Sequence, residues 1–527
     1  MLKSSAADRK VARHPRKKNR VREEEQLYLL REPTNRREYF TGQAHVAKNG
    51  AANGMRPYVA LKTGNRRYRQ TERDLLFQRY GDKLIVNSML TRRVVSFQAS
   101  KRMPFYRWLK YKEAFSPELV DYLFDIAALS NDASIEILDP FAGTGTALTR
   151  AVARKWNATG IELMPVGACS LKARFIADRV SLTSFHRALD RLHEIDWKAV
   201  DPRWRFQHLA ITKSAFPARS EREMSAYVTW INHLRDPDVR YLFWFAALSV
   251  LEEASFTRKD GQYLRWDYRS GRKLAKHFDK GPVPSFSAAI HQRLREFASD
   301  LKCRNGGTFS THARVIEGSC LMELPKLPAR SVDLVITSPP YCNRYDYTRT
   351  YALELAFCGL GEEQVRTLRQ TLLSATVENK SKRSALKAYY VQMGVQARSI
   401  QVEQAYDHQA ALHEALSLLQ DARDHGELSN KNVPVLVENY FLEMAYVVFE
   451  IARVLRRGGV AFIVNDNVRY HGEEVPVDLI LCDFAEAAGL TTECIWVLPR
   501  GKGNSSQQMG RWGRYELRKC VYCWRKP

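Results

Sequence analysis

The sequence predicts an α/β protein whose central sheet has seven mostly parallel strands and is interrupted by two largely helical inserts. Two observations carry this prediction. The apolar run at residues 334–336 has no polar break, which is typical of a parallel strand buried on both faces. Strand-like runs of this kind alternate with helix-patterned segments along the chain, and that alternation indicates a doubly wound parallel sheet.

Each predicted strand is a short run of β-branched, aromatic or other apolar residues that ends in polar or turn-forming residues. Ligands of open α/β sheets bind at the carboxyl ends of the strands, so the residues after each strand are the first candidates for a functional site. The last two strands are expected to form a closing hairpin. The seven predicted strands are residues 135–139, 158–162, 313–317, 334–336, 461–464, 493–498 and 519–524.

The composition gives the first indication of a partner. Lys and Arg number 82 against 58 Asp and Glu, a net charge of +24, and an excess of this size favours a polyanion such as nucleic acid. No apolar run approaches the length of a membrane span, so no membrane association is expected. The nine cysteines lack a disulfide framework and are expected to be reduced thiols of a cytoplasmic protein. Cys520 and Cys523 fall on a predicted strand, so core packing is expected there and no metal site.

The fourth predicted strand leads directly into Ser338-Pro-Pro-Tyr341. Neither Pro339 nor Pro340 can donate to a sheet ladder, so the chain leaves the sheet here in a stiff turn. We expect the Ser338 hydroxyl and the Pro339 carbonyl to lie beside the Tyr341 ring as two fixed acceptors. Two acceptors and a flat ring suit a planar base that carries an exocyclic amino group. A proline-rich turn after a core strand is the alternative interpretation of this motif alone.

The first predicted strand ends at Asp139 and enters the turn 139–146, Asp-Pro-Phe-Ala-Gly-Thr-Gly-Thr, which opens a helix. A Gly-x-Gly alone is weak evidence, and a dinucleotide fingerprint would have a third glycine where Leu148 stands. The second predicted strand ends at Glu162. Acids at these two strand ends suit a cofactor, because Glu162 can hold ribose hydroxyls and Asp139 can meet a cationic amino-acid group.

Together, the 139–146 turn and Thr337-Ser-Pro-Pro-Tyr341 resemble the cofactor and catalytic motifs of the amino-methylating DNA methyltransferases, which use S-adenosyl-L-methionine. The resemblance covers residues 101–175, 311–360 and 433–527. It implies a Rossmann-like S-adenosylmethionine-dependent methyltransferase sheet, a double-stranded DNA substrate and flipping of the target base. It leaves the oligomeric state and a partnership with a cognate restriction endonuclease open.

The resemblance also implies roles for single residues. In this family a segment just before the glycine strand closes over the methionine end of the cofactor; Phe115 and Ser116 match it, and Ser116 can cap a helix that begins with Pro117. Many relatives carry an acid after the third strand, where Ser319 stands here and can still bond the adenine. The implied catalytic residues are Ser338, Pro339, Pro340 and Tyr341, and the implied cofactor-binding residues are Phe115, Ser116, Asp139, Phe141, Gly143, Gly145, Thr146, Glu162 and Ser319.

The target base is expected to be cytosine, methylated at N4, because Thr-Ser-Pro-Pro-Tyr resembles the N4-cytosine members of the family. Adenine members more often carry Asp or Asn in place of Ser338, so N6-adenine methylation stays open. RNA guanine-N2 methylation and a non-catalytic nucleic-acid-binding protein on the same fold are further alternatives, ahead of a nicotinamide oxidoreductase. Cys342 lacks the Pro-Cys context of the carbon-5 enzymes and is expected to be incidental.

Cations alternate with aromatic residues in the first insert, a pattern that can hold phosphates and stack on bases. The alternative is an exposed basic hairpin without that function. The second insert carries acids throughout, which suits a solvated helical surface, so we expect target recognition in the first insert. The predicted DNA-binding residues are Arg258, Lys259, Arg265, Trp266, Arg269 and Arg272.

These predictions divide the chain into seven segments. The sheet is assigned to a cofactor half, a part with the catalytic motif and a C-terminal part, and the inserts separate these parts. In chain order the segments are a basic arm expected to be disordered (1–40), an N-terminal extension (41–100), the cofactor half (101–175), the first insert (176–310), the catalytic part (311–360), the second insert (361–432) and the C-terminal part (433–527).

Overall fold

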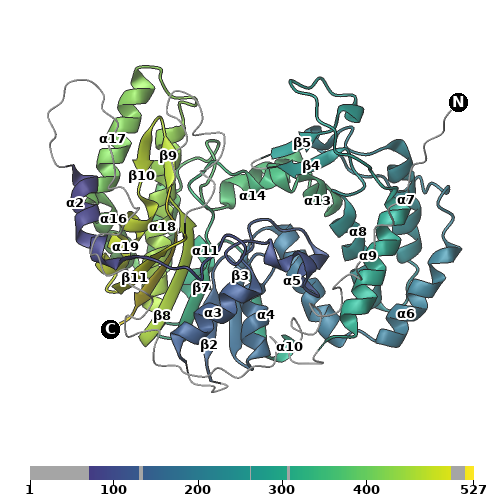
Figure 1. The fold of residues 1–527 in the computed structure, drawn as a ribbon, viewed down its shortest axis with the longest axis horizontal. Coiled ribbons are helices and arrows are strands. Elements are labelled where there is room, and N and C mark those ends of the chain that lie inside the picture. Colours follow the sequence, from purple (N-terminus) through teal and green to yellow (C-terminus); the bar gives the residue numbers. More distant parts are fainter. Residues whose placement is uncertain (1–70, 130–133, 261–262, 305–308, 500–516) are drawn as a thin grey trace, which may run out of the picture. The chain divides into compact units, whose positions relative to one another are not determined.

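The structure, a computed structural model, describes residues 71–129, 134–260, 263–304, 309–499 and 517–527 (Figure 1). The arm predicted at 1–40 and the first part of the extension predicted at 41–100 lie outside the described residues.

An eight-stranded sheet forms the centre of the described chain (Figure 1). The strand order is β1-β11-β12-β8-β7-β2-β3-β6. Strand β12 is antiparallel to both of its neighbours, and the other pairs are parallel, which confirms the predicted α/β fold with a mostly parallel sheet. The predicted strands correspond to β2 (Glu136–Asp139), β3 (Asn157–Glu162), β6 (Ala313–Glu317), β7 (Val332–Thr337), β8 (Leu455–Asp466), β11 (Thr491–Val497) and β12 (Lys519–Arg525).

The eighth strand, β1 (Leu84–Val86), was not predicted as part of the sheet. It is three residues long and lies at the edge, where it pairs in parallel with β11 through Leu84 and Ile495. The run at residues 83–86 is strand-like, but only Leu84 of the three strand residues is buried, so the pattern does not indicate that it joins the sheet. Residues 84–86 form a strand because they pair with β11, which lies far along the chain.

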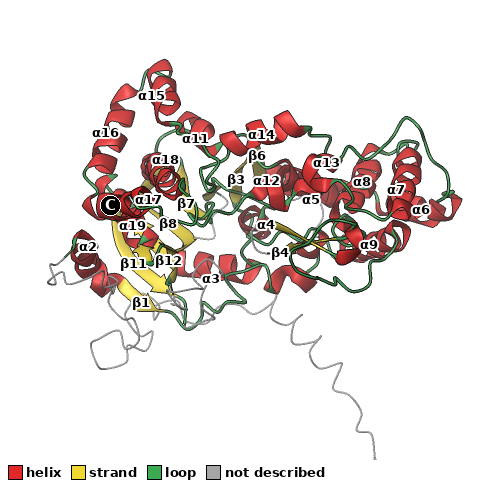
Figure 2. Cartoon of the chain, turned by 90° about the horizontal axis from the view of Figure 1, so that it is seen from above, coloured by secondary structure: helices red, strands yellow, loops and turns green. Residues whose placement is uncertain are grey.

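Helices cover both faces of the sheet (Figure 2). Leu334 and Ile336 of β7 pack in the apolar cluster formed with α3 and α4, whereas Val335 packs in the cluster formed with α18 and α19. This alternation explains why the run at 334–336 is apolar at every position. The covering helices are α3 (Pro117–Ala127), α4 (Thr146–Ala153), α18 (Val433–Val454) and α19 (Val477–Ala487).

The first insert forms a helical group with its own apolar cluster and a small hairpin (Figure 1). Helices α5 (Pro165–Arg179) and α13 (Ala352–Phe357) also contribute to this cluster, so the insert packs directly on the elements that follow β3 and β7. The insert contains α6 (Leu182–Asp190), α7 (Ala218–Ile231), α8 (Pro237–Val250), β4 (Thr257–Asp260), β5 (Tyr263–Trp266), α9 (Phe286–Leu301) and α10 (Phe309–His312).

The second insert supplies an outer layer on one side of the sheet. Helices α16 and α17 pack against α18, and α17 also packs against α2 (Glu72–Tyr80). The short hairpin of β9 (Val468–Tyr470) and β10 (Glu473–Val475) follows β8. The remaining helices are α11 (Cys320–Glu323), α12 (Tyr347–Thr350), α14 (Glu362–Thr371), α15 (Arg383–Gln392), α16 (Gln396–Asp407) and α17 (Ala410–Asp424).

Candidate functional site

A cavity lies at the carboxyl ends of β2, β3, β6 and β7, which is where open α/β sheets bind their ligands. It brings residues of the 139–146 turn together with residues of the Ser338–Tyr341 motif. Four of the predicted cofactor-binding and catalytic residues do not line the cavity: Ser116, Gly145, Pro339 and Tyr341. The predicted residues that do line it are Phe115, Asp139, Phe141, Gly143, Thr146, Glu162, Ser319, Ser338 and Pro340.

The turn after β2 depends on two glycines with positive φ. Gly145 has φ +79 and precedes the first residue of α4, and a Cβ added there would lie 2.3 Å from the Leu171 side chain. Gly143 has φ +53, and its N–H donates to Oε2 of Glu162 over 2.5 Å. Glycine adopts this backbone conformation without steric cost. The two glycines therefore bring the turn close to α5 and to the Glu162 carboxylate.

Asp139 and Glu162 are both buried where they meet the cavity. Oδ1 of Asp139 accepts from the Phe141 N–H at 3.1 Å and from the Thr337 hydroxyl at 2.6 Å. Oε1 of Glu162 accepts from the Met164 N–H at 2.6 Å. Burial raises the pKa of Asp139 to about 7 and that of Glu162 to about 8, while these hydrogen bonds act in the opposite direction. Near neutral pH both carboxyls are poised to lose a proton when a donor or cation enters the cavity.

The segment ahead of α3 forms another wall. Phe115 lines the cavity, whereas Ser116 is fully buried as the N-cap of α3, where it accepts from the Leu119 N–H at 3.2 Å and donates to the Val94 carbonyl. Ser116 therefore fixes the backbone that presents Phe115. Tyr111 and Glu113 of the same segment also line the cavity.

The Ser338–Tyr341 motif begins where β7 ends, at Thr337. Ser338 and Pro340 line the cavity, and the Ser338 hydroxyl donates to the Tyr341 hydroxyl at 3.2 Å. Burial raises the pKa of Tyr341, so its hydroxyl stays neutral. Cys342 is fully buried, and burial also raises the pKa of its thiol. A thiol that is buried and protonated is a poor nucleophile.

The second insert contributes to the same cavity. Leu372 and Leu373 follow α14 and line the cavity beside Ser319, whose hydroxyl donates to the Thr371 carbonyl at 3.4 Å. This contribution was not predicted, because leucines in a helical insert usually pack in a core. Tyr111, Glu113 and Tyr347 were also not predicted, although Tyr111 and Glu113 belong to the same segment as the predicted Phe115.

The cations of the β4–β5 hairpin are mostly engaged within the insert. Arg265 lies over the Phe278 ring and pairs with Asp260 at 3.2 Å. Arg269 pairs with the fully buried Asp267 at 2.6 Å. These contacts hold the hairpin and the loop after it together.

Arg272 behaves in the same way. Its guanidinium stacks on Trp266 at 3.7 Å and donates to the Lys213 carbonyl at 2.8 Å. Of the six predicted DNA-binding residues, Arg258 and Arg269 are exposed, and Arg265, Trp266 and Arg272 are half-buried.

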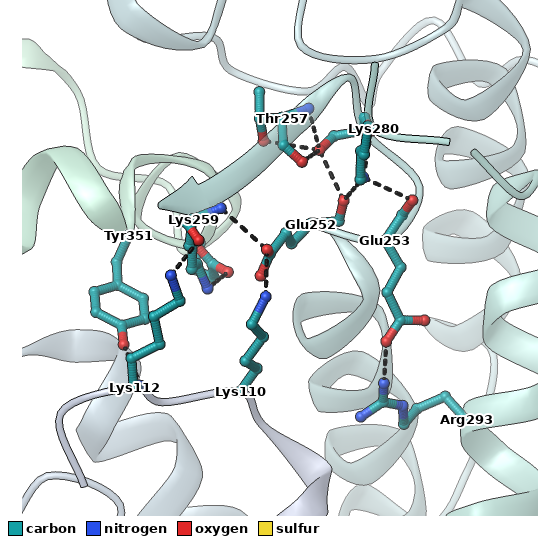
Figure 3. Close-up of polar contacts among 11 residues, drawn as sticks. Lys110, Lys112, Glu252, Glu253, Thr257, Lys259, Lys280, Arg293 and Tyr351 are labelled. Carbon is teal, nitrogen blue, oxygen red and sulfur yellow. Dashed lines mark hydrogen bonds and ion pairs between the residues drawn. The ribbon is translucent and has the colours of Figure 1, made fainter. Parts of the chain in front are cut away.

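The position of Lys259 differs from the expectation of a DNA contact. Its side chain is buried, its ammonium pairs with Glu354 at 2.5 Å, and it lies 4.4 Å from the centre of the Tyr351 ring (Figure 3). The reason is that β4 alternates, so Thr257 and Lys259 face the protein while Arg258 faces outward. In addition, Lys110 pairs with Glu252 at 2.6 Å and Lys112 donates to the Lys259 carbonyl, which joins the cavity wall to the first insert.

Two classes of feature are absent from the part of the chain that the structure describes. No helix among the described residues is long and apolar enough to cross a membrane. The same residues contain no group of three or more His, Cys, Asp or Glu side chains arranged to hold a metal ion.

The fold and this cavity define a Rossmann-like methyltransferase, and comparison with known proteins is consistent with that class. The chain is 42% identical over 462 residues to the type II methyltransferase M.AvaI of Nostoc sp., covering 86% of this chain and 92% of the relative. It is 37% identical over 475 residues to the type II methyltransferase M.BsoBI of Geobacillus stearothermophilus, covering 87% of this chain and 92% of the relative. The chain belongs to the family of type II DNA methyltransferases, and S-adenosyl-L-methionine is its methyl donor.

A second M.AvaI, from Anabaena variabilis, matches with the same 42% identity over 462 residues. No protein-family model matches the chain. No solved structure matches it either.

The residues of the cavity fit S-adenosyl-L-methionine. Asp139 and Glu162 offer buried carboxyls that, once ionised, can accept from an ammonium group and from ribose hydroxyls. Gly143 lacks a side chain where the chain turns past Glu162. Phe141, Ile161 and Met164 add apolar walls of the kind that a purine ring requires.

Proposed function

We propose that the protein transfers a methyl group to the exocyclic amino group of a base flipped out of double-stranded DNA, and that the base is cytosine, methylated at N4. The observation that carries the proposal is the position of Ser338 and Pro340, which line the same cavity as Asp139 and Glu162. A substrate base in contact with Ser338 would thus lie next to a cofactor held by the two acids. Membership of the type II DNA methyltransferases supports DNA as the substrate.

The cofactor roles follow from the chemistry of each group. Glu162 would accept from the ribose hydroxyls, and Asp139 would meet the cationic amino-acid end. Ser319 would hydrogen-bond the adenine, and Phe115 would cover the methionine end from the segment that Ser116 anchors. Phe141, Gly143, Gly145 and Thr146 would form the turn beneath the cofactor; among them, Gly145 acts through backbone conformation, because it does not line the cavity.

The protein's part in the reaction is to position the base and to exclude water. An exocyclic amino nitrogen is a weak nucleophile because its lone pair is delocalised into the ring. The Ser338 hydroxyl and the Pro339 carbonyl would accept its two hydrogens and favour a nitrogen whose lone pair faces the cofactor. Tyr341 would stack on the flipped base, with Pro340 fixing the turn. The cofactor supplies an activated methyl group, and alignment and desolvation provide most of the acceleration.

Support for N4 of cytosine comes from Ser338, where amino-methylating relatives that act on adenine more often carry Asp or Asn. The proposal also includes a cognate restriction endonuclease, as the type II class suggests, and a cytoplasmic location, which the nine free cysteines support. Contact with DNA is assigned to the exposed side of the first insert, starting from Arg258.

The test is to identify the methylated nucleoside. Purified protein is incubated with labelled S-adenosyl-L-methionine and duplex DNA, the DNA is digested, and the nucleosides are separated by mass spectrometry. N4-methylcytosine is expected. N6-methyladenine would change the base assignment alone, whereas 5-methylcytosine would overturn amino-group transfer.

A further inference from the structure

Glu113 is a carboxylate on the cavity wall that has no role in the proposed function. It belongs to the segment ahead of α3 and lines the cavity together with Ser338 and Pro340. Lys110 and Lys112, its neighbours in sequence, reach away to Glu252 and to the Lys259 carbonyl of the first insert (Figure 3). Among the described residues, no cation forms an ion pair with Glu113. A carboxylate without an ion-pair partner inside a cavity usually has a function there.

The groups around Glu113 are mainly tyrosines. The Tyr351 hydroxyl donates to its Oε2. Burial raises the pKa values of the surrounding tyrosines, and the nearby Glu113 charge raises them further, so all of them are neutral donors. Lys112 is the neighbour of Glu113 in the sequence, and burial lowers the pKa of Lys112. The tyrosines in question are Tyr111, Tyr341, Tyr345, Tyr347 and Tyr351.

Three carboxylates line the cavity, and they differ in the bonds they already make. Asp139 accepts from the Phe141 N–H and the Thr337 hydroxyl, and Glu162 accepts from the N–H groups of Gly143 and Met164. Both are thus held by the turns that form the cofactor side. Glu113 is instead held by a tyrosine hydroxyl through one oxygen, and its charge acts on Tyr341 of the catalytic motif.

Transfer of a methyl group to an amino nitrogen requires a place for a proton. Attack by the nitrogen forms a nitrogen–carbon bond, the carbon–sulfur bond breaks with its electron pair going to sulfur, and the nitrogen is left with a positive charge. One of its two protons must then leave. The Ser338 hydroxyl and the Pro339 carbonyl can accept hydrogen bonds but cannot take up that proton near neutral pH. A carboxylate at the cavity wall can.

We propose that Glu113 is the proton acceptor of the reaction, taking one proton from the methylated amino nitrogen of the flipped base and later releasing it to solvent. This inference rests on the proposed amino-group transfer. It assigns the three cavity carboxylates to separate tasks, with Asp139 and Glu162 on the cofactor and Glu113 on the base.

The experiment compares Glu113→Gln with the full-length wild-type protein in single-turnover methylation of duplex DNA from pH 5 to 9. Because a positioned base contributes roughly 100-fold or more, the variant should lose about that factor in rate. The loss should persist at saturating S-adenosyl-L-methionine, so that the pH-dependent affinity for the cofactor does not enter the comparison. Affinities for S-adenosyl-L-methionine and for DNA, measured by calorimetry and by fluorescence anisotropy, should remain within about twofold, because the base is not a binding group.

Two further variants serve as controls. Glu118→Gln removes a carboxylate of α3 that pairs with Arg93 at 3.1 Å and does not line the cavity, so its single-turnover rate should match the wild type. Tyr351→Phe keeps the stacking on Tyr111 at 4.9 Å but removes the donor to Glu113. Without that hydrogen bond the Glu113 carboxylate is positioned less firmly, so the single-turnover rate should fall, by a smaller factor than in Glu113→Gln.

The outcomes separate the two proposals. A Glu113→Gln rate equal to wild type, or a loss that saturating S-adenosyl-L-methionine restores, would overturn the role of Glu113 and leave amino-group transfer intact. If the Gln variant does not fold, a Tyr351→Phe rate equal to wild type overturns the inference and a reduced rate with unchanged cofactor affinity supports it. A wild-type product other than a methylated amino group would refute the proposed function itself.

Discussion

The Thr337 hydroxyl donates a hydrogen bond of 2.6 Å to Oδ1 of Asp139. Thr337 is the last residue of β7 and Asp139 the last residue of β2, and these two strands are parallel neighbours at the centre of the sheet. Both groups are buried, so this bond joins the strand that leads into the catalytic motif to the strand that leads into the cofactor turn. The bond also favours the ionised form of Asp139 against the effect of burial.

Removing this bond should weaken cofactor binding without touching the cofactor. Thr337→Val keeps the shape of the side chain but raises the pKa of Asp139, so less of the carboxylate is ionised at pH 7. A hydrogen bond to a charged group contributes about 1.5–3 kcal/mol, so affinity should fall by roughly tenfold or more in calorimetry. Thr337→Ser retains the hydroxyl and should bind nearly as the wild type does. Equal binding by Thr337→Val and wild type would contradict this account.

Cofactor affinity should depend on pH through Asp139 and Glu162. Their pKa values are raised to about 7 and about 8, so below pH 7 both carry protons in the free protein. Binding of a cation and of hydroxyl donors favours the ionised forms and releases protons, so affinity should rise from pH 6 to about 8. Asp139→Asn should flatten the part of this rise near pH 7. Calorimetry in buffers of different ionisation enthalpy measures the protons released.

The carboxyls of Asp139 and Glu162 should also make the stability of the fold depend on pH, in the direction opposite to that of cofactor affinity. Because the folded protein holds these protons at pH values where the unfolded chain has lost them, the free energy of unfolding without cofactor should fall as pH rises from about 4 to 8. Thermal unfolding of wild type and of Glu162→Gln over this range checks the sign. A smaller fall in the Gln variant is expected.

Substitutions at Asp139 and Glu162 should impair cofactor binding, whereas a substitution in the Ser338–Tyr341 motif should impair turnover. Asp139→Ala and Glu162→Ala each remove an acceptor worth about 1.5–3 kcal/mol and should weaken cofactor binding. Tyr341→Ala should leave cofactor affinity nearly intact, because Tyr341 does not line the cavity. It should abolish turnover, because Tyr341 is proposed to stack on the flipped base. Loss of the cofactor in Tyr341→Ala with retention in Asp139→Ala would reverse the two assignments.

DNA binding is best tested on cations that the fold does not use. Changing Arg265, Trp266 and Arg269 together would disturb the hairpin, because these residues make contacts within the insert. Arg258→Ala with Lys273→Ala changes two exposed cations of the first insert and should lower DNA affinity, with a salt slope smaller by about two.

The matched control is Arg366→Ala with Lys380→Ala, which changes two exposed cations of the second insert, of which Arg366 makes a surface ion pair with Glu363. Anisotropy at several salt concentrations should show little change for this pair. If instead only the control pair lost specific binding, target recognition would belong to the second insert. Cofactor affinity should survive in both double variants.

The sheet was predictable because its strands are buried on both faces. Leu334, Val335 and Ile336 pack alternately in two apolar clusters, so every position had to be apolar. The strand-like run at residues 83–86 could not be assigned to the sheet, since its partner Ile495 lies far along the chain and no local pattern records that pairing. The cofactor motif was visible because Gly145 must adopt a positive φ in a fixed place after a strand.

In the basic stretch of the first insert, the sequence pattern did not reveal which cations form ion pairs within the protein. The sequence displays the cations but not which of them are paired: Arg269 is held by the buried Asp267, and Lys259 by the buried Glu354. Glu354 belongs to α13, far along the chain, so the pairing depends on the tertiary fold. Leu372 was not predicted either, because its position at the cavity depends on how the second insert packs in the folded protein.

The separation of β2 from β7 along the chain has a consequence for how the protein comes into being. The first insert, whose helices make contacts close in sequence, can form early, whereas β2 must wait for β7 to close a very long loop. The cofactor site needs both strands, so it is completed near the end of folding. A newly made chain would thus acquire its helices first and its capacity to bind the methyl donor last.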